Sequence, residues 1–237
     1  MIERDTELQI TSEPAIAYSM CYRLPFLSLF HADCMEIMKQ YPDKYFDLAI
    51  VDPPYGIKIM KQWGAAKHDY RQFEVKQWDN EIPTAEYYQQ LFRVSKNQII
   101  WGGNYFTDFL PPSQCWLMWD KGQREFTLAD GELAWTSFDK AVRICTIHRS
   151  NKNNPDRIHI SQKPEKLYNW MLSKFATEGM KLLDTHFGSG SIALAVDKAN
   201  RLDKMNLHLT ACEIDKEYID KAIKRISESI KQGTLSF

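Results

Sequence analysis

The residue types best suited to chemistry stand together at Asp52-Pro53-Pro54-Tyr55. They follow an apolar run, residues 46–51, that is typical of a buried strand. The prolines fix the backbone and present a carbonyl without a competing N–H. A carboxylate and such a carbonyl can accept both hydrogens of an exocyclic amine, and the tyrosine can stack on the ring that carries it. The alternative is a plain Pro-Pro turn without chemistry.

A second segment, Phe187-Gly188-Ser189-Gly190-Ser191, lies between a predicted strand (181–184) and a predicted helix (192–199). Its two glycines allow the backbone to turn sharply and to approach a ligand closely. Glu213 ends the next predicted strand, and an acid there suits hydrogen bonds to ribose hydroxyls. The full G-x-G-x-x-G fingerprint and the G-x-x-x-x-G-K-[ST] loop are both missing from the sequence. The pattern therefore favours a nucleoside ligand without a pyrophosphate; a tight turn alone is the alternative.

Together the two segments resemble the motifs of the amino-methylating DNA methyltransferases. The order, with Asp52–Tyr55 before Phe187–Ser191, resembles the beta group of that family. Residues 159–164, His-Ile-Ser-Gln-Lys-Pro, resemble the segment that opens a helix just ahead of the glycine motif in that group, and His31-Ala32-Asp33 resembles another family element. Thr185-His186 after Asp184, where the family usually has Asp-Pro, is a mild departure. Ser191 in place of the more usual threonine is another.

The resemblance implies S-adenosylmethionine as cofactor, double-stranded DNA as partner, and methyl transfer to N6 of an adenine flipped out of the duplex. It also makes a restriction-modification context and a homodimer plausible. The implied catalytic residues are Asp52, Pro53, Pro54 and Tyr55. The implied cofactor-binding residues are Asp33, Ser161, Lys163, Asp184, Phe187, Gly188, Ser189, Gly190, Ser191 and Glu213. No metal is expected, because the methyl donor is already activated.

Several of these residues have a simpler interpretation. Asp33 is either a contact to the cofactor's adenine, as the resemblance implies, or a solvated strand-end acid or helix cap. Ser161 either binds the cofactor or caps the helix that starts at Pro164. Phe187 either packs on the cofactor or fills the core. Trp101 and Trp116 are interpreted as core residues rather than as surfaces for base stacking.

Contacts with DNA would need local positive patches, because the formal net charge of -1 provides no global positive field. Residues 56–81 are predicted to be a mobile functional loop. This loop interleaves aromatic residues with basic ones: Lys58, Lys61, Lys67, Arg71 and Lys76. A DNA-contacting insertion is predicted over about residues 120–160, and the overlapping stretch 140–166 carries Arg143, Arg149, Lys152 and Arg157. The alternative for both patches is a solvated surface.

With 237 residues, the chain is predicted to form a single methyltransferase domain over 1–237. Strands are expected at 27–33, 46–51, 97–101, 116–119, 132–138, 142–147, 181–184 and 207–213. Helices are expected at 34–40, 87–94, 164–175, 192–199 and 216–231. This alternation predicts a Rossmann-like α/β fold, with a mostly parallel twisted sheet covered by helices on both faces. Residues 132–138 and 142–147 are expected to form an antiparallel strand pair.

The composition fits a cytoplasmic protein without a membrane span, because the longest apolar runs are short and the N-terminus shows no signal pattern. The five cysteines are scattered, which favours free thiols and argues against a zinc site.

Three rival functions remain open. The first is N4-cytosine methylation, although such enzymes more often carry serine in place of Asp52. The second is methylation of an RNA base, and the third is a catalytically silent nucleic-acid-binding module of the same fold.

Overall fold

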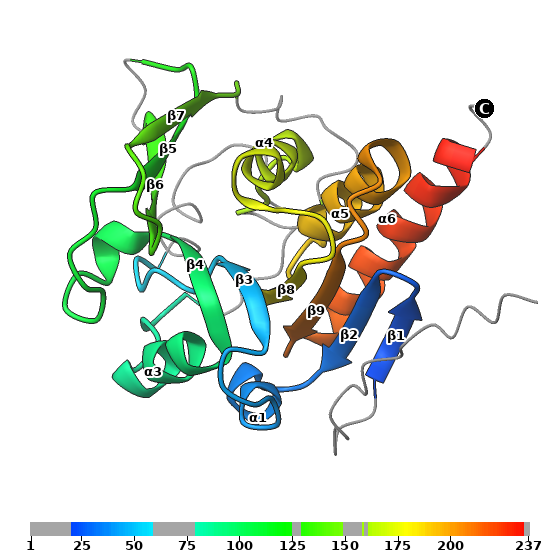
Figure 1. Cartoon of the computed structure of the whole chain (residues 1–237), viewed down its shortest axis with the longest axis horizontal. Coiled ribbons are helices and arrows are strands. Elements are labelled where there is room, and N and C mark those ends of the chain that lie inside the picture. The colour runs from blue at the N-terminus through cyan, green and yellow to red at the C-terminus, as the bar shows by residue number, and fades with distance from the viewer. Residues whose placement is uncertain (1–19, 59–78, 125–128, 149–157, 159–160, 235–237) are drawn as a thin grey trace, which may run out of the picture.

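The computed structural model describes residues 20–58, 79–124, 129–148, 158 and 161–234. Its strands form one nine-stranded sheet in the order β1-β2-β9-β8-β3-β4-β6-β5-β7 (Figure 1). The strands are β1 (Met20–Leu24), β2 (Leu27–His31), β3 (Phe46–Val51), β4 (Ser95–Trp101), β5 (Trp116–Asp120), β6 (Gly131–Thr136), β7 (Arg143–Thr146), β8 (Lys181–Asp184) and β9 (His208–Glu213). The helices are α1 (Cys34–Met38), α3 (Ala85–Val94), α4 (Glu165–Phe175), α5 (Ser191–Asp203) and α6 (Lys216–Thr234), with a 3-10 turn η1 (Gly103–Tyr105).

The centre of the sheet is parallel. Strands β2, β9, β8, β3 and β4 pair in parallel in that order. The chain runs outward from β3 to β4 in one direction and from β8 to β9 in the other. Strand order therefore reverses between β3 and β8, the place where doubly wound sheets bind their ligands, outside the carboxyl ends of the strands.

Helices cover both faces of this parallel part. Along β3, Leu48 and Ile50 join one buried cluster with residues of α4, α5 and α6, whereas Ala49 and Val51 join a second cluster with residues of α1 and α3. The alternation follows from the two-residue period of a strand, and an apolar run buried on both faces is what a central parallel strand requires. The predicted Rossmann-like fold is confirmed.

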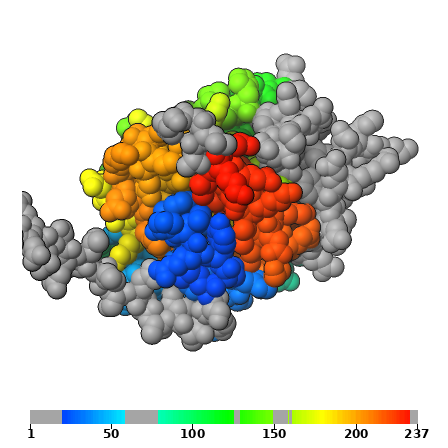
Figure 2. Space-filling model, turned by 90° about the vertical axis from the view of Figure 1, so that its right-hand side faces the viewer, coloured from blue at the N-terminus to red at the C-terminus, as the bar shows by residue number. Residues whose placement is uncertain are grey.

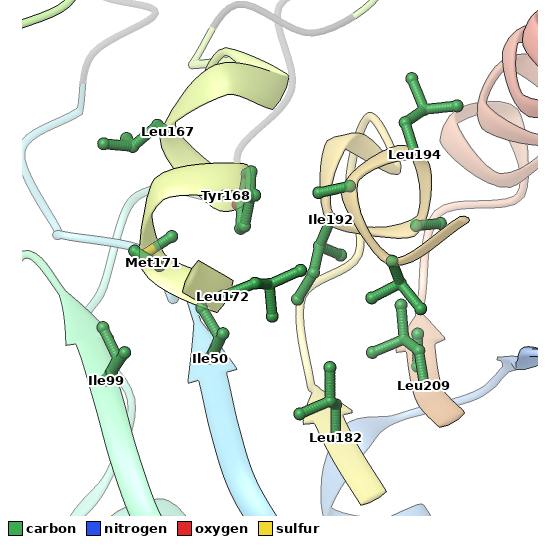
Figure 3. Close-up of a cluster of buried hydrophobic side chains, with 14 of the residues drawn as sticks. Ile50, Ile99, Leu167, Tyr168, Met171, Leu172, Leu182, Ile192, Leu194 and Leu209 are labelled. Atoms are coloured by element: carbon green, nitrogen blue, oxygen red, sulfur yellow. The ribbon is translucent and has the colours of Figure 1, made fainter. Parts of the chain in front are cut away.

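Helix α4 packs on β3 and β4. Figure 3 shows Leu167, Met171 and Leu172 of α4 lying over Ile50 and Ile99, and all five side chains are buried. The spacing of these three α4 residues places them on one helical face. Because α4 begins immediately after Pro164, this packing fixes the position of the segment just before the helix.

The antiparallel part of the sheet differs from the expectation. The predicted pair, residues 132–138 with 142–147, is wrong: β6 and β7 both flank β5, antiparallel and parallel to it respectively. Strand β5 contributes Leu117 and Trp119 to the buried core, whereas β7 is largely exposed, with Ile144 62% exposed. The more apolar strand therefore occupies the interior position and β7 forms the edge.

The other predicted elements within the described residues are confirmed to within a few residues. Strand β1 was not predicted; it pairs antiparallel with β2. The hydroxyl of its Tyr22 lies 3.2 Å from that of Ser227 on α6, and Figure 2 shows the β1–β2 edge beside α6. Most of the predicted loop (59–78) and parts of the predicted insertion (125–128, 149–157 and 159–160) lie outside the described residues. None of the helices in the described part of the chain has the length and apolar character needed to cross a membrane.

Candidate active site

The turn that follows β3, Asp52–Tyr55, is called the signature turn here. The Asp52 side chain is 19% exposed, and its Oδ2 lies 2.5 Å from Nζ of Lys163. Its Oδ1 accepts a hydrogen bond of 2.7 Å from the Tyr55 hydroxyl. Pro53 is buried, and Pro54 and Tyr55 are half-buried. Both oxygens of the carboxylate are thus oriented by neighbours, while each retains a second lone pair for a further donor.

Lys163 lies two residues before the start of α4, and its side chain is only 2% exposed. Its ammonium also contacts the Tyr55 hydroxyl at 3.1 Å and Glu132 Oε2 at 3.3 Å, and it lies 5.1 Å from the centre of the Trp101 ring. Burial opposes the charged form, but Asp52 and Glu132 outweigh it and raise the pKa of Lys163. Lys163 was expected among the cofactor-binding residues. The structure brings its ammonium to the signature turn.

Glu132, near the start of β6, was not predicted as a site residue. Its Oε1 forms an ion pair of 2.7 Å with Lys121, and its Oε2 faces Lys163. Burial favours the neutral acid, yet the two lysines prevail and lower the pKa of Glu132 to about 2. The only available signal was a charged residue at the beginning of an apolar strand, Glu132-Leu133-Ala134-Trp135. We refer to Asp52, Tyr55, Lys121, Glu132 and Lys163 as the charged cluster.

The Tyr55 ring and backbone are held by three further residues. Asp79, which is buried, accepts hydrogen bonds from the backbone N–H groups of Tyr55 (2.8 Å) and Gly56 (3.0 Å). Tyr105 stacks on the ring with centroids 5.1 Å apart and an interplanar angle of 17°. Gly102 has φ +71°, and a Cβ atom there would lie 2.2 Å from the Tyr55 ring. Tyr55 is therefore fixed in position in the free protein.

The glycine turn, Phe187–Ser191, lies between β8 and α5 as predicted. Glu213 Oε2 accepts a hydrogen bond of 2.8 Å from the Gly188 N–H, and Glu213 Oε1 accepts one of 2.9 Å from the Asp215 N–H. Gly190 has φ +69°, a left-handed conformation that favours glycine. Glu213 is thus tied to the glycine turn by a hydrogen bond.

Side chains around the glycine turn hold its other end. Arg225 of α6 donates to the Ser189 carbonyl oxygen (2.9 Å) and to the Ser191 hydroxyl (3.1 Å). The Ser189 and Ser191 hydroxyls lie 3.1 Å apart, and both residues are buried. Phe187 is 3% exposed and belongs to the core cluster beneath α5, which supports its interpretation as a packing residue.

Asp184 ends β8 and is buried, with one carboxylate oxygen accepting the His186 N–H at 3.0 Å. Burial raises its pKa to about 8, so the carboxyl group is largely protonated at neutral pH. The two residues that depart from the family pattern, Thr185 and His186, form a side-chain hydrogen bond of 2.9 Å, and the Tyr87 hydroxyl bonds Thr185 at 2.7 Å.

Asp33 and Ser161 lie at the margins of the site. Asp33 is the N-cap of α1 and accepts a 2.7 Å hydrogen bond from the Met35 N–H, so its expected role as a helix cap is confirmed. The preceding strand end, His31, pairs with Glu213. Ser161 does not cap α4, whose N-cap is Pro164 without a side-chain cap bond. The helix-cap interpretation of Ser161 is therefore wrong.

The signature turn and the glycine turn share one edge of the sheet. Strands β3 and β8 are adjacent and parallel, with Leu48 opposite Leu182 and Ala49 opposite Leu183. Asp52 directly follows β3, and the glycine turn begins three residues after Asp184, the last residue of β8. Because both turns leave the carboxyl ends of neighbouring strands, they open onto the same side of the molecule (Figure 1).

Comparison with known proteins agrees with this architecture. A family model for N6- and N4-methyltransferases, described as DNA methylase, matches residues 74–224, more than half of the chain. The type II methyltransferase M.HpaI of Haemophilus parainfluenzae is 35% identical over 80 residues. That alignment covers 34% of this chain and 23% of M.HpaI, so most of that enzyme is unmatched.

Two solved structures share the fold. The PvuII DNA methyltransferase, described as cytosine-N4-specific, superposes with a TM-score of 0.60 at 13% identity and covers 89% of each chain. The M1.HpyAVI–SAM complex superposes with a TM-score of 0.51 at 18% identity and covers 84% of this chain and 99% of that one. The fold is therefore that of the S-adenosylmethionine-dependent DNA methyltransferases. The chain belongs to the N6/N4 DNA methylase family.

S-adenosylmethionine is the methyl donor of this family, so the cofactor expected from the sequence is confirmed. The glycine turn fits such a ligand. Among the described residues, a Cβ atom at Gly188 would meet only the His186 carbonyl oxygen, at 3.9 Å, so the backbone there is open to close approach. Beside it, the Glu213 carboxylate is already oriented by two backbone N–H groups, and Ile214 exposes 67% of its surface as an apolar contact.

Proposed function

We propose that this chain transfers a methyl group from S-adenosylmethionine to N6 of an adenine flipped out of double-stranded DNA. The observation that most directly supports this proposal is the position of Asp52. This residue directly follows β3, and β3 lies beside β8, the strand that leads into the glycine turn. The residues that would bind the amine and those that would bind the cofactor thus lie on neighbouring strands. Holding two reactants in a near-attack arrangement can supply much of a rate enhancement.

The signature turn supplies what an aromatic amine needs. The N6 lone pair is delocalised into the ring, so the amine is a poor nucleophile until its hydrogens are held out of the ring plane. Asp52 and the Pro53 carbonyl would accept those two hydrogens, and the Tyr55 ring would stack on the base. When bound, S-adenosylmethionine supplies a methyl group already activated by its positive sulfur. The chain then only has to bind and orient the two partners.

Glu213 and the Gly188 backbone are the proposed cofactor contacts, with Asp33, Ser161, Asp184 and the remaining residues of the glycine turn around them. One carboxylate oxygen of Asp33 accepts the capping hydrogen bond of α1, which leaves the other oxygen available to a ligand. We assign Lys163 to the amine-binding side of the site, because its ammonium contacts Asp52 and Tyr55.

The DNA duplex must open for this chemistry, because the target atom is inaccessible in stacked DNA. Among the described residues, Lys58 is exposed three residues after the signature turn, which supports a phosphate contact near the site. Lys140 and Arg143 of the second predicted patch are also exposed, but Lys140 contacts the carbonyl oxygen of Lys174 at the C-terminal end of α4 and Arg143 pairs with Leu117 at the start of β5, away from the signature turn. A single domain, a homodimer, a cytoplasmic location and a restriction-modification context remain predictions from the sequence.

Adenine is proposed over cytosine because N4-cytosine enzymes more often carry serine at the position of Asp52. The competing base deserves a direct test, since the PvuII enzyme of similar fold is described as cytosine-N4-specific. The protein is incubated with methyl-labelled S-adenosylmethionine and unmethylated duplex DNA, and the DNA is digested to nucleosides. Label in N6-methyladenine supports the proposal. Label in N4-methylcytosine, or label only in RNA supplied in parallel, contradicts it, and no transfer to either would favour a silent module.

A further inference from the structure

The charged cluster places two carboxylates and two ammonium groups, all largely shielded from solvent, beside the proposed amine-binding turn. The side chains of Asp52, Glu132, Lys121 and Lys163 are 19%, 24%, 11% and 2% exposed, and their formal charges cancel. Buried charges are tolerated only when they are paired and hydrogen-bonded. Removal of any one of these four charges would leave the cluster with one uncompensated charge.

The Lys163 ammonium has as many acceptors as it has hydrogens. A protonated lysine carries three N–H groups. Lys163 faces Asp52 Oδ2 at 2.5 Å, the Tyr55 hydroxyl at 3.1 Å and Glu132 Oε2 at 3.3 Å. Three acceptors around three donors define one orientation of the ammonium. Loss of the Glu132 carboxylate would release one of the three and allow the lysine to move.

Glu132 itself is anchored on the sheet. Strand β6 pairs with β4, where Trp101 lies opposite Ala134 and the Gly102 N–H donates to the Leu133 carbonyl oxygen at 2.8 Å. Lys121, which follows β5, holds the other carboxylate oxygen of Glu132 at 2.7 Å. Residues on strands hold a site more precisely than residues on loops.

We propose that Glu132 is a positioning residue, whose carboxylate holds the Lys163 ammonium against Asp52 and the Tyr55 hydroxyl before the target base arrives. This inference rests on the proposed function, because it concerns the groups that engage the amine. Glu132 acts through Lys163 and need not touch the base.

The cluster also sets the charge state of Asp52. Its neighbours are Lys163, Glu132 and Tyr55, with Asp184 and Tyr168 also close enough to interact electrostatically. Burial raises the pKa of Asp52, Lys163 lowers it, and Glu132 raises it. The acceptor function of Asp52 requires the ionised form. Removing Glu132 should therefore move the acid limb of the pH–rate profile to lower pH, and removing Lys163 should move it to higher pH.

The test compares Glu132→Gln, Glu132→Asp and Lys163→Met with the wild-type protein in the labelled methyl-transfer assay. Asp130→Asn, an exposed acid just before β6, is the matched control and should behave as wild type. For Glu132→Gln we expect kcat to fall about tenfold with an unchanged KM for the cofactor, since misplacement of a group by about 1 Å can cost up to 10²-fold. The opposite movements of the acid limb provide a readout that a merely structural role would not produce.

Glu132→Asp keeps the charge but shortens the side chain, so it isolates position from charge and serves as the main test if Glu132→Gln fails to fold. A reduced kcat in Glu132→Asp, at normal thermal stability, supports the inference. Wild-type kcat in Glu132→Asp, or acid limbs that move the same way in Glu132→Gln and Lys163→Met, overturns it. If the wild-type protein places no label in adenine, the proposed function is contradicted. If the wild-type protein labels adenine and the Glu132 variants have the same kinetics as wild type, only the inference about Glu132 is contradicted.

Discussion

The Lys163 ammonium lies 2.5 Å from Oδ2 of Asp52, and the same ammonium contacts the Tyr55 hydroxyl at 3.1 Å. Lys163 thus joins the segment before α4 to the turn after β3. Burial raises the pKa of Asp52, and the ion pair with Lys163 opposes this effect, since a nearby cation favours the charged form of a carboxylate. It also orients the Tyr55 ring through its hydroxyl.

Replacement of Asp52 by asparagine should nearly abolish methyl transfer while preserving cofactor binding. The amide keeps the shape of the side chain but removes the charge that the amine hydrogens and Lys163 engage. A fall in kcat of roughly 10²–10³-fold is expected, the range found when one electrostatic contact to a transition state is removed. Single-turnover transfer and cofactor titration by calorimetry measure the two effects. Asp203→Asn, an exposed acid at the end of α5, is the control; turnover by Asp52→Asn at the rate of this control would refute the assignment.

Two variants should distinguish the role of the Tyr55 ring from the role of its hydroxyl. Tyr55→Phe keeps the ring but loses the contacts to Asp52 and Lys163, so we expect mainly a lower kcat. Tyr55→Ala also loses base stacking, which contributes about 1–3 kcal/mol per base, so the KM for DNA should rise as well. Steady-state kinetics with a fixed duplex distinguish the two. Equal kinetics for Tyr55→Ala and wild type would exclude the stacking role.

Gly102 should be intolerant of any side chain. A Cβ atom there would lie 2.2 Å from the Tyr55 ring, so Gly102→Ala must displace the ring. Gly179 is a matched control, because it also has a positive φ (+77°) but none of the described residues has an atom within 4 Å of the corresponding Cβ position. We expect Gly102→Ala to lose methyl transfer well beyond any loss in Gly179→Ala, with cofactor affinity unchanged in both. Similar methyl transfer by the two variants would show that the position of the Tyr55 ring does not affect the reaction.

The two glycines of the glycine turn should respond differently to substitution. A Cβ at Gly190 would face Ile226 at 3.0 Å and Phe187 at 3.1 Å, so Gly190→Val should disturb the core and lower both Tm and cofactor affinity. The Gly188 position is open, so Gly188→Ala should weaken cofactor binding with a much smaller change in Tm. Calorimetry and thermal unfolding measure both. Wild-type cofactor affinity in both variants would refute the assignment of the cofactor to this turn.

The buried Asp184 should make stability depend on pH. Burial raises its pKa from an ordinary value of 3.8 to about 8, so between these values the folded state binds more protons than the unfolded state. Stability from this residue is therefore present below about pH 4 and is lost as pH rises toward 8. In thermal unfolding without cofactor, the Tm of wild type minus that of Asp184→Asn should become more negative across this window. A constant difference would show that Asp184 is ionised in the folded protein.

The sequence predicted the parallel core and both turns because their signals are local. The apolar run 46–51, the glycines of 187–191 and the acid at 213 each reveal a strand end from a few adjacent residues. The partners of Asp52 could not be predicted this way. Glu132 reaches both Lys163 and Lys121 only because β6 pairs with β4 and β5, and the pairing expected from the sequence, 132–138 with 142–147, was wrong. Asp79 and Gly102 likewise act on Tyr55 through contacts that no sequence period encodes.

A crystal structure of the protein with S-adenosylhomocysteine and a duplex containing its target site would test the central claim most directly. We predict an extruded adenine stacked on Tyr55, with N6 within hydrogen-bonding distance of the Asp52 carboxylate and the Pro53 carbonyl oxygen, and the nucleoside product beside Gly188 and Glu213. A base held away from Asp52, or a nucleoside bound at another edge of the sheet, would contradict it.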